Sequence, residues 1–224
     1  MTDPAPDAPL GVIDALLTTR AMRRFTDEPV TDDEIRQCLA AAQQAPTGGN
    51  VQPQQYLVLT DPEPKAVVGE LYRLSYERYE RALGDPASFR SPEDEASWRR
   101  TRAASQHLAD HLHEAPALVL FLLPIIPWGA RDDEGFLDIG PLYASVYPAV
   151  QNFCVAARAL GIGTALTTVI RIRTEEVRAA LGIPDGYEIA ALVPMGRPVG
   201  RFGQARRKPA AAVTHWQRWG NRQR

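Results

Sequence analysis

The sequence predicts an α+β fold in which helices cover a small mixed sheet, and three observations support this. Few runs among the 224 residues have the β-branched and aromatic character of strands. Long segments with helical periodicity lie between these runs. No linker or shift in composition divides the chain, so we expect one domain over residues 10–224, after a flexible, proline- and aspartate-rich stretch over 1–9.

The first elements are helical, and local signals mark their ends. Apolar residues from 12 to 17 predict a short helix that ends near Thr19, and a basic turn follows it over 20–25. Thr31 and Glu34 have the spacing of a capping box, which predicts the start of a helix. This helix should end at Ala45, because the residue before a proline is disfavoured in the α region.

The rest of the chain alternates between strand and helix signals. Strands are expected over 55–60, 115–123 and 189–195, with a further β-prone run over 164–169. Helices are expected over 63–113, with breaks near 84–86 and 91–92, and over 142–160 and 174–181. A loop is expected over 124–134.

Composition argues against two classes of partner. The net charge of −2 would attract neither nucleic acid nor a membrane surface. The longest apolar run, 115–127, is too short for a bilayer, which takes about 20 residues, and the N-terminal residues do not resemble a signal peptide. We therefore expect a cytoplasmic protein. Its two cysteines, Cys38 and Cys154, are expected to be buried, reduced thiols.

Two histidines on a predicted helix, His107 and His111, have a spacing that could bind a metal ion. A metalloprotease helix would need a glutamate after the first histidine, and Leu108 stands there. We therefore expect surface histidines and no metal site.

The stretch 45–53, Ala-Pro-Thr-Gly-Gly-Asn-Val-Gln-Pro, is the first candidate for a binding site. Its two glycines permit a ligand to approach the backbone closely. The side-chain amides of Asn50 and Gln52 both donate and accept hydrogen bonds. A flat heterocycle with polar edges could lie against this loop, but a plain helix-to-strand turn has the same features.

Two basic clusters could complete such a site. Arg20, Arg23 and Arg24 lie in the turn after the first helix, and the segment 197–224 has several basic residues and no acidic one. Arginine binds phosphate oxygens with two parallel hydrogen bonds, although isolated basic clusters are usually solvated.

Taken together, these motifs resemble those of the FMN-dependent nitroreductase family. The order of several motifs, over roughly residues 14–213, is more specific than any single glycine-containing loop. The residues that carry the resemblance are Arg20-Ala21-Met22-Arg23-Arg24-Phe25, Pro29-Val30, 45–53, Gln151-Asn152, Leu160-Gly161-Ile162-Gly163-Thr164, Leu181-Gly182-Ile183-Pro184, Pro194-Met195-Gly196-Arg197-Pro198 and Arg207-Lys208-Pro209.

The resemblance implies a mostly antiparallel sheet flanked by helices, in an intertwined homodimer with FMN at the subunit interface. The basic turn and the tail would hold the FMN phosphate, the loop would contact a flavin bound mainly by the other subunit, and a threonine pair would lie near flavin N5. A donor at N5 would stabilise the reduced ring. The cofactor-binding residues implied in this way are Arg20, Ala21, Arg23, Pro46, Thr47, Gly48, Asn50, Thr167, Thr168 and Arg207.

Three positions depart from the common pattern of the family. Ala21 replaces the usual serine, so a phosphate-binding hydroxyl is lost while the backbone N–H remains. Gln54 replaces an aromatic residue, which we expect to loosen packing near the strand without touching the chemistry. Thr167 and Thr168 are similar to the reductive deiodinase branch, in which a threonine hydroxyl bonds flavin N5 and one-electron steps are favoured.

The leading hypothesis is an FMN-dependent oxidoreductase that takes hydride from NADH or NADPH and reduces a nitroaromatic, quinone or conjugated small molecule by a ping-pong mechanism. The flavin supplies the chemistry, so no catalytic side chain is expected. The alternatives are a reductive dehalogenase or other one-electron flavin chemistry, and a non-catalytic FMN-binding protein. Trp128 and Tyr143 could line the substrate pocket or pack in the core or dimer interface.

Overall fold

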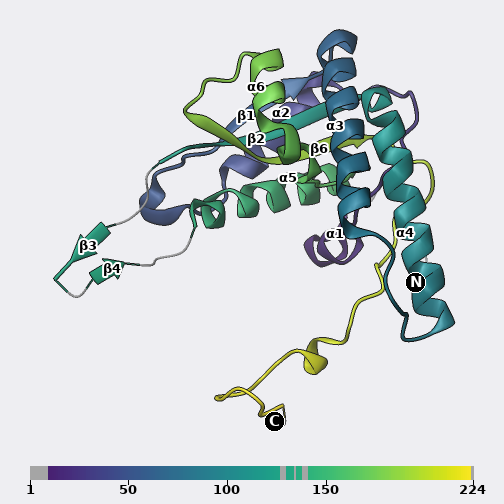
Figure 1. Ribbon diagram of the computed structural model, residues 1–224, viewed down its shortest axis with the longest axis vertical. Helices are drawn as coiled ribbons and strands as arrows, with labels where there is room; N and C mark the ends of the chain where they lie inside the picture. Colours follow the sequence, from purple (N-terminus) through teal and green to yellow (C-terminus); the bar gives the residue numbers. More distant parts are fainter. Residues whose placement is uncertain (1–9, 127–129, 134, 138–140, 223–224) are drawn as a thin grey trace.

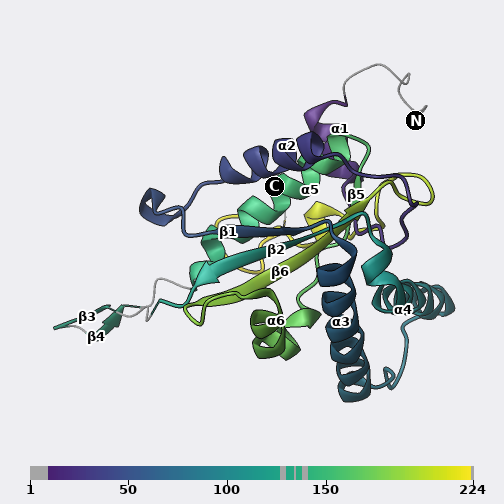
Figure 2. The same ribbon diagram turned by 90° about the horizontal axis from the view of Figure 1, so that it is seen from above.

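The computed structural model describes residues 10–126, 130–133, 135–137 and 141–222 (Figure 1). Its centre is a four-stranded sheet in the order β1-β2-β6-β5, with every pair of strands antiparallel. Helices cover both faces of the sheet (Figure 2), which confirms the predicted α+β class. The strands of the sheet are β1 (Gln55–Leu59), β2 (Ala117–Pro124), β5 (Gly163–Thr164) and β6 (Tyr187–Gly196).

Strand β2 shows why both faces of the sheet must be covered. Val119 and Phe121 belong to one hydrophobic cluster, whereas Leu118 and Leu120 belong to another on the opposite face. The first cluster packs against α2 (Asp32–Gln43) and α5 (Tyr147–Ala159), near α1 (Val12–Thr18). The second packs against α3 (Pro62–Leu83), α4 (Pro92–His111) and α6 (Thr174–Leu181). A strand buried on both faces is expected to be continuously apolar, as this one is.

Several helix ends match the signals in the sequence. The Thr31 side chain accepts the Glu34 N–H, and the Glu34 carboxylate accepts the Thr31 N–H at 2.9 Å, which confirms the capping box at the start of α2. Helix α2 ends at Gln43, before Pro46. Helix α3 ends at Leu83, before the predicted break at 84–86, and α4 begins at Pro92, at the second predicted break.

Three expectations were wrong or incomplete. The predicted loop 124–134 contains β3 (Ala130–Asp132), which pairs with β4 (Gly135–Leu137). The β-prone run 164–169 forms only the two-residue β5 and one bridge at Thr167, because the Thr167 hydroxyl accepts the Val169 N–H and the chain turns into the 3-10 helix η4 (Val169–Arg173). The predicted helix 142–160 begins with the 3-10 helix η3 (Leu142–Ser145).

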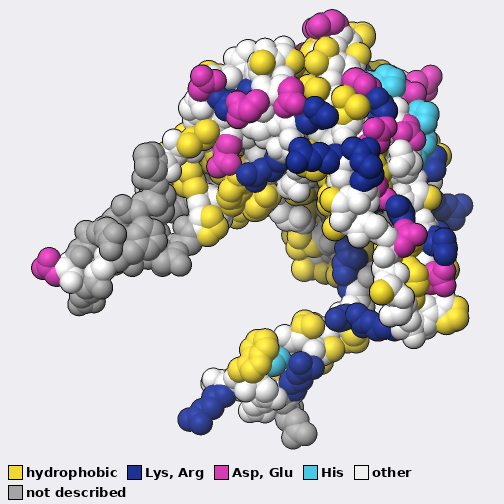
Figure 3. Space-filling view, in the orientation of Figure 1, with side chains coloured by type: hydrophobic (Ala, Val, Ile, Leu, Met, Phe, Trp, Pro, Cys, Tyr) yellow, Lys and Arg dark blue, Asp and Glu magenta, His cyan; other side chains and the backbone are white. Residues whose placement is uncertain are grey.

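The remaining 3-10 helices are η1 (Gly48–Asn50), η2 (Leu112–Glu114) and η5 (Ala210–Ala212). Helix η5 lies in the C-terminal segment, which extends from the body as an arm with an open space beside it (Figure 3). Trp219 on this arm is 91% exposed.

Two further expectations concern cysteines and membranes. Cys38 on α2 and Cys154 on α5 are buried and free. Burial raises the pKa of Cys38 to about 12 and that of Cys154 to about 11, so both are unreactive thiols at neutral pH. Of the helices in the described residues, none has the length and apolar character needed to cross a bilayer.

Candidate functional site

The basic turn 20–25 is fixed by backbone hydrogen bonds to two other segments. The Met22 N–H donates to the carbonyl of Thr164 in β5 at 2.8 Å. The Thr26 N–H donates to Arg197 O and the Val199 N–H to Arg24 O, both at 2.9 Å. This close approach requires Gly163 on β5, because a Cβ there would lie 2.9 Å from Met22 Cβ. The backbone therefore positions the turn independently of most of its side chains.

The predicted phosphate-binding residues of this turn are available for an anion. The Arg20 guanidinium is exposed and contacts the Arg201 carbonyl at 3.4 Å. Within the described part of the chain, neither Arg20 nor Arg23 forms an ion pair with a carboxylate, and the Ala21 N–H makes no hydrogen bond. Two cations and a backbone donor suit an anion with several oxygens, such as a phosphate group.

The predicted threonine pair lies beside this turn, and its members differ. The Thr167 hydroxyl is 3.1 Å from the Tyr72 hydroxyl and accepts the Val169 N–H at 3.3 Å. Thr168 is exposed, and its hydroxyl bonds none of the described residues. Burial raises the pKa of Tyr72, while the bond to Thr167 and the charge of Arg23 oppose this shift. The structure thus brings Arg23 and Thr167 close to the same tyrosine.

The predicted loop lies at the other end of the sheet, before the start of β1 (Figure 2). Gly49 and Asn50 both have a φ of 56° and Gln52 has a φ of 47°, in the left-handed region that disfavours side chains. Two hydrogen bonds stabilise this shape: the Gly48 N–H donates to Ser145 Oγ at 3.2 Å, and the Gln52 N–H to Thr47 Oγ1 at 3.1 Å. Pro46 and Gly48 are exposed, as Asn50 is.

The loop and the basic turn do not meet within one chain. They lie at opposite ends of the sheet (Figure 2), and no hydrogen bond or ion pair between described residues joins them. Arg207 likewise makes no hydrogen bond or ion pair with the described residues of the turn. It is exposed on the C-terminal arm, where its guanidinium donates to Arg206 O at 3.3 Å. A site that used all three features would need a second chain.

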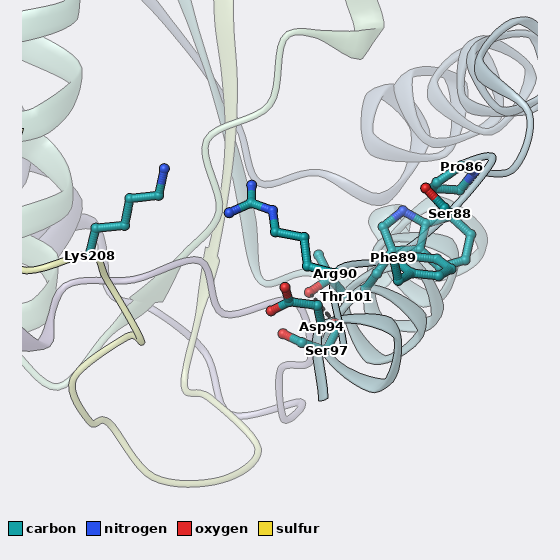
Figure 4. A pocket seen from close by; sticks show the side chains of 9 residues that line it. Pro86, Ser88, Phe89, Arg90, Asp94, Ser97, Thr101 and Lys208 are labelled. Atoms are coloured by element: carbon teal, nitrogen blue, oxygen red, sulfur yellow. Dashed lines mark hydrogen bonds between the residues drawn. The ribbon is translucent and has the colours of Figure 1, made fainter. Parts of the chain in front are cut away.

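A separate cavity of about 530 Å³ lies between the α3–α4 connection and the C-terminal arm (Figure 4). It contains none of the cofactor-binding residues predicted from the sequence. Its lining consists of Pro86, Ser88, Phe89, Arg90, Asp94, Ser97, Trp98, Thr101 and Lys208.

Tyr143, one predicted pocket wall, is engaged with the protein itself. Its hydroxyl donates to the Glu188 carboxylate, which also accepts from Arg171 at 3.2 Å. The Arg171 guanidinium lies 4.8 Å from the centre of the Tyr143 ring. Burial raises the pKa of Tyr143 to about 12. Trp128, the other predicted wall, lies outside the described residues.

The predicted surface histidines form a small cluster. The His107 and His111 rings stack at 4.3 Å, and His111 Nδ1 is 2.9 Å from the Glu114 carboxylate. The part of the chain that the structure describes contains no group of three or more potential metal ligands.

Comparison with known proteins places these features in a family. A model of the nitroreductase family matches residues 16–197. The FMN reductase (NAD(P)H) of Bacillus subtilis is 27% identical over 208 residues, which cover 91% of this chain and 72% of the relative.

Two solved structures have a similar fold. A nitroreductase from Desulfovibrio desulfuricans in complex with FMN has a TM-score of 0.64 and 23% identity, covering 98% of this chain and 99% of its own. An iodotyrosine deiodinase bound to FMN and 3-iodo-L-tyrosine has a TM-score of 0.68 and 21% identity, covering 89% of this chain and 96% of its own. Because the family model spans most of the sequence, this chain belongs to the nitroreductase family.

Proposed function

We propose that two copies of this chain bind FMN at their interface and use NADH or NADPH to reduce a nitroaromatic, quinone or conjugated small molecule. The observation that carries the proposal is the pair Arg20 and Arg23, two cations that no described carboxylate neutralises. The charge of Arg23 acts on Tyr72, whose hydroxyl contacts Thr167, the residue before the exposed Thr168. The family match and the relatives that bind or reduce FMN support the choice of cofactor.

The residues present fit a phosphorylated flavin at this place. The turn offers Arg20, Arg23 and the Ala21 N–H to a phosphate, and the exposed Thr168 offers a hydroxyl and a backbone edge to a ring. The loop 46–50 of the second chain would face that ring, since the loop of the same chain lies at the far end of the sheet. FMN, when bound, supplies the transfer of electrons between nicotinamide and acceptor.

The protein's part in this reaction is positioning. The basic turn would hold the phosphate, because charge-assisted hydrogen bonds are the strong ones. Thr168 would donate to the edge of the ring that gains electron density, which favours its reduction. The reaction needs no general acid from the chain, because an open cleft lets water deliver protons.

The test of this function begins with the purified protein. We expect a yellow protein whose released flavin contains one phosphate, and anaerobic NADH or NADPH should bleach it in a single rapid phase. Protein that binds FMN but is bleached by neither nicotinamide would be a non-catalytic FMN-binding protein. A colourless protein that takes up no added FMN would contradict the proposal as a whole.

The tail residue Arg207 gives a sharper test of the assembly. It donates to no described group beyond the neighbouring Arg206 carbonyl, so its substitution leaves the fold intact. A charge-assisted contact to phosphate contributes about 1.5–3 kcal/mol, so Arg207→Ala should raise the Kd for FMN at least about tenfold. Arg218→Ala, a change of the same kind further along the arm, is the control. Equal Kd values would remove Arg207 from the site.

A second candidate is reductive dehalogenation, and the difference between the two threonines favours it. The Thr167 hydroxyl is occupied by Tyr72 and Val169, whereas the Thr168 hydroxyl bonds none of the described residues. The deiodinase with a similar fold makes this chemistry worth testing. Anaerobic photoreduction separates the two functions, because absorption spectra distinguish one-electron from two-electron reduction, and Thr168→Ala should abolish the one-electron signal.

A further inference from the structure

A chain of side-chain amides links strand β1 to the tip of the loop 46–52. Gln54 Nε2 donates to Gln43 Oε1 at 3.3 Å, and Gln43 Nε2 donates to Gln52 Oε1 at 3.2 Å. Gln52 Nε2 then donates to Asn50 Oδ1 at 3.2 Å. The Tyr56 hydroxyl supports the chain by donating to Gln43 Oε1 at 3.1 Å. Gln43 and Gln52 therefore both donate and accept within this series of amides, whereas Gln54 at one end only donates and Asn50 at the other only accepts.

The hydrogen bonds of this chain all run in one direction, from Gln54 outward. At the outer end, Asn50 accepts through Oδ1, and its Nδ2 makes no hydrogen bond to a described residue. At the inner end, Gln54 is only 3% exposed, and its Oε1 is buried without a partner. Reversing the chain would place the Gln54 NH₂ group at that buried position, and buried donors without partners are less tolerated than carbonyl oxygens. The fixed inner end therefore sets the orientation at the outer end.

We propose that Gln43 is a positioning residue that orients the Asn50 amide through Gln52, so that Asn50 presents its Nδ2 donors to the flavin held by the other subunit. The inference deepens the proposed function and rests on it. It assigns a role to three glutamines, Gln43, Gln52 and Gln54, of which the last replaces the aromatic residue usual in the family. Hydrogen bonds in such a chain polarise one another, which strengthens the terminal donor.

A donor from Asn50 would act on the cofactor in two ways. It would hold the ring by one hydrogen bond, and it would favour the reduced ring, whose heteroatoms carry more electron density. Reversal of the amide chain would point Asn50 Oδ1 at the same place. An acceptor facing an acceptor loses the bond and leaves both groups without a donor.

The test uses two substitutions of Gln43 and one matched control. In Gln43→Glu the carboxylate still accepts from Gln54 and Tyr56 but cannot donate to Gln52. The side-chain amides of Gln52 and Asn50 must then flip, which reverses the hydrogen bonds from Gln43 outward. In Gln43→Met the series of amide hydrogen bonds is interrupted without a change of charge. The control is Gln44→Glu, which adds the same charge one residue later, where the exposed side chain makes no described hydrogen bond.

FMN affinity, the midpoint potential of the bound flavin and the melting temperature are measured for each variant. We expect Gln43→Glu to raise the Kd for FMN about tenfold, because a lost bond is replaced by repulsion, and to make the potential more negative than in Gln44→Glu. Gln43→Met should weaken binding less, and all melting temperatures should agree within a few degrees.

Equal affinities and potentials in Gln43→Glu and Gln44→Glu would overturn the inference while leaving the proposed function intact. A lower melting temperature for Gln43→Met with an unchanged Kd would also overturn it, since Gln43 would then be purely structural. Wild-type protein that binds no FMN would contradict the proposed function and the inference with it.

Discussion

At the β5 end of the sheet, the turn 20–25 is held by backbone hydrogen bonds to Thr164 and to the segment 197–199. At the β1 end, the loop 46–52 is held largely by side chains, including Ser145 and Gln43, and three of its residues have positive φ. Backbone hydrogen bonds persist through most substitutions, whereas one substitution can remove a polar side chain together with its hydrogen bonds. The two halves of the proposed site should therefore respond differently to mutation. The turn should keep its conformation when one of its side chains is replaced, whereas the loop should change shape when one supporting side chain is lost.

The largest effect should come from a cation of the turn. Arg23→Ala removes a charge but no described ion pair, so the fold should persist while the Kd for FMN rises about ten- to a hundredfold, the equivalent of a charge-assisted hydrogen bond. Arg24→Ala is the control, since Arg24 is exposed and its charge acts on His107 of α4. Titration of flavin fluorescence measures both. Equal affinities would show that the turn does not hold the phosphate.

The rigidity of the turn is tested at Gly163. In Gly163→Ala the new Cβ would lie 2.9 Å from Met22 Cβ and 3.1 Å from Pro198 Cβ, so the turn must move away from β5. Overpacking of this kind costs about 1–3 kcal/mol. Urea unfolding measures the decrease in unfolding free energy. The control is Gly186→Ala, where a Cβ meets nothing within 4 Å. If Gly163→Ala left the free energy of unfolding unchanged, the turn would be as easily deformed as the loop.

Sequence patterns predicted the residues of the turn and of the loop, but only some of the interactions that hold these two segments in place. The capping box at Thr31 and the break at Pro46 are local signals, and they fixed the ends of α2. The bond from Tyr72 to Thr167 and that from Gly48 to Ser145 join residues 95 and 97 positions apart, which no local pattern encodes. Gln54 was expected to loosen packing, yet it is buried and donates to Gln43, because an amide can satisfy a neighbouring amide where an aromatic ring cannot.

The loop should depend on single polar contacts, and Ser145 is the simplest to remove. Ser145→Ala leaves the Gly48 N–H without its acceptor, at a cost of about 1 kcal/mol, which corresponds to about a fivefold rise in the Kd for FMN. Ser105→Ala on α4 is the matched control, since that hydroxyl bonds no described residue. If the two variants bound FMN equally, the loop would keep its shape without Ser145.

Helix α2 joins the two halves, because it ends at Gln43 beside the loop and begins near the turn. At its start, Arg197 donates to Glu34 at 2.6 Å and to Glu28 at 3.1 Å. Burial by itself would raise the pKa of Glu34, but the bonds from the Thr31 N–H and from Arg197 outweigh it and lower the pKa below its ordinary value. A carboxyl with a lowered folded pKa stabilises the protein above its unfolded pKa of about 4.3, and this stabilisation is lost as the pH falls through the folded pKa.

Glu34→Gln keeps an acceptor for the Thr31 N–H and removes the ion pair with Arg197, so it should give the smallest effect, about 0.5 kcal/mol at pH 7. The difference in unfolding free energy from the wild type should shrink as the pH falls below about 4, because the wild-type carboxyl is then protonated as well. Urea unfolding at pH 7, 5 and 3.5 measures it, with the exposed Asp33→Asn in the same helical turn as control. A difference that stayed constant across this range would mean that the charge of Glu34 does not help to anchor α2 at the rigid end of the sheet.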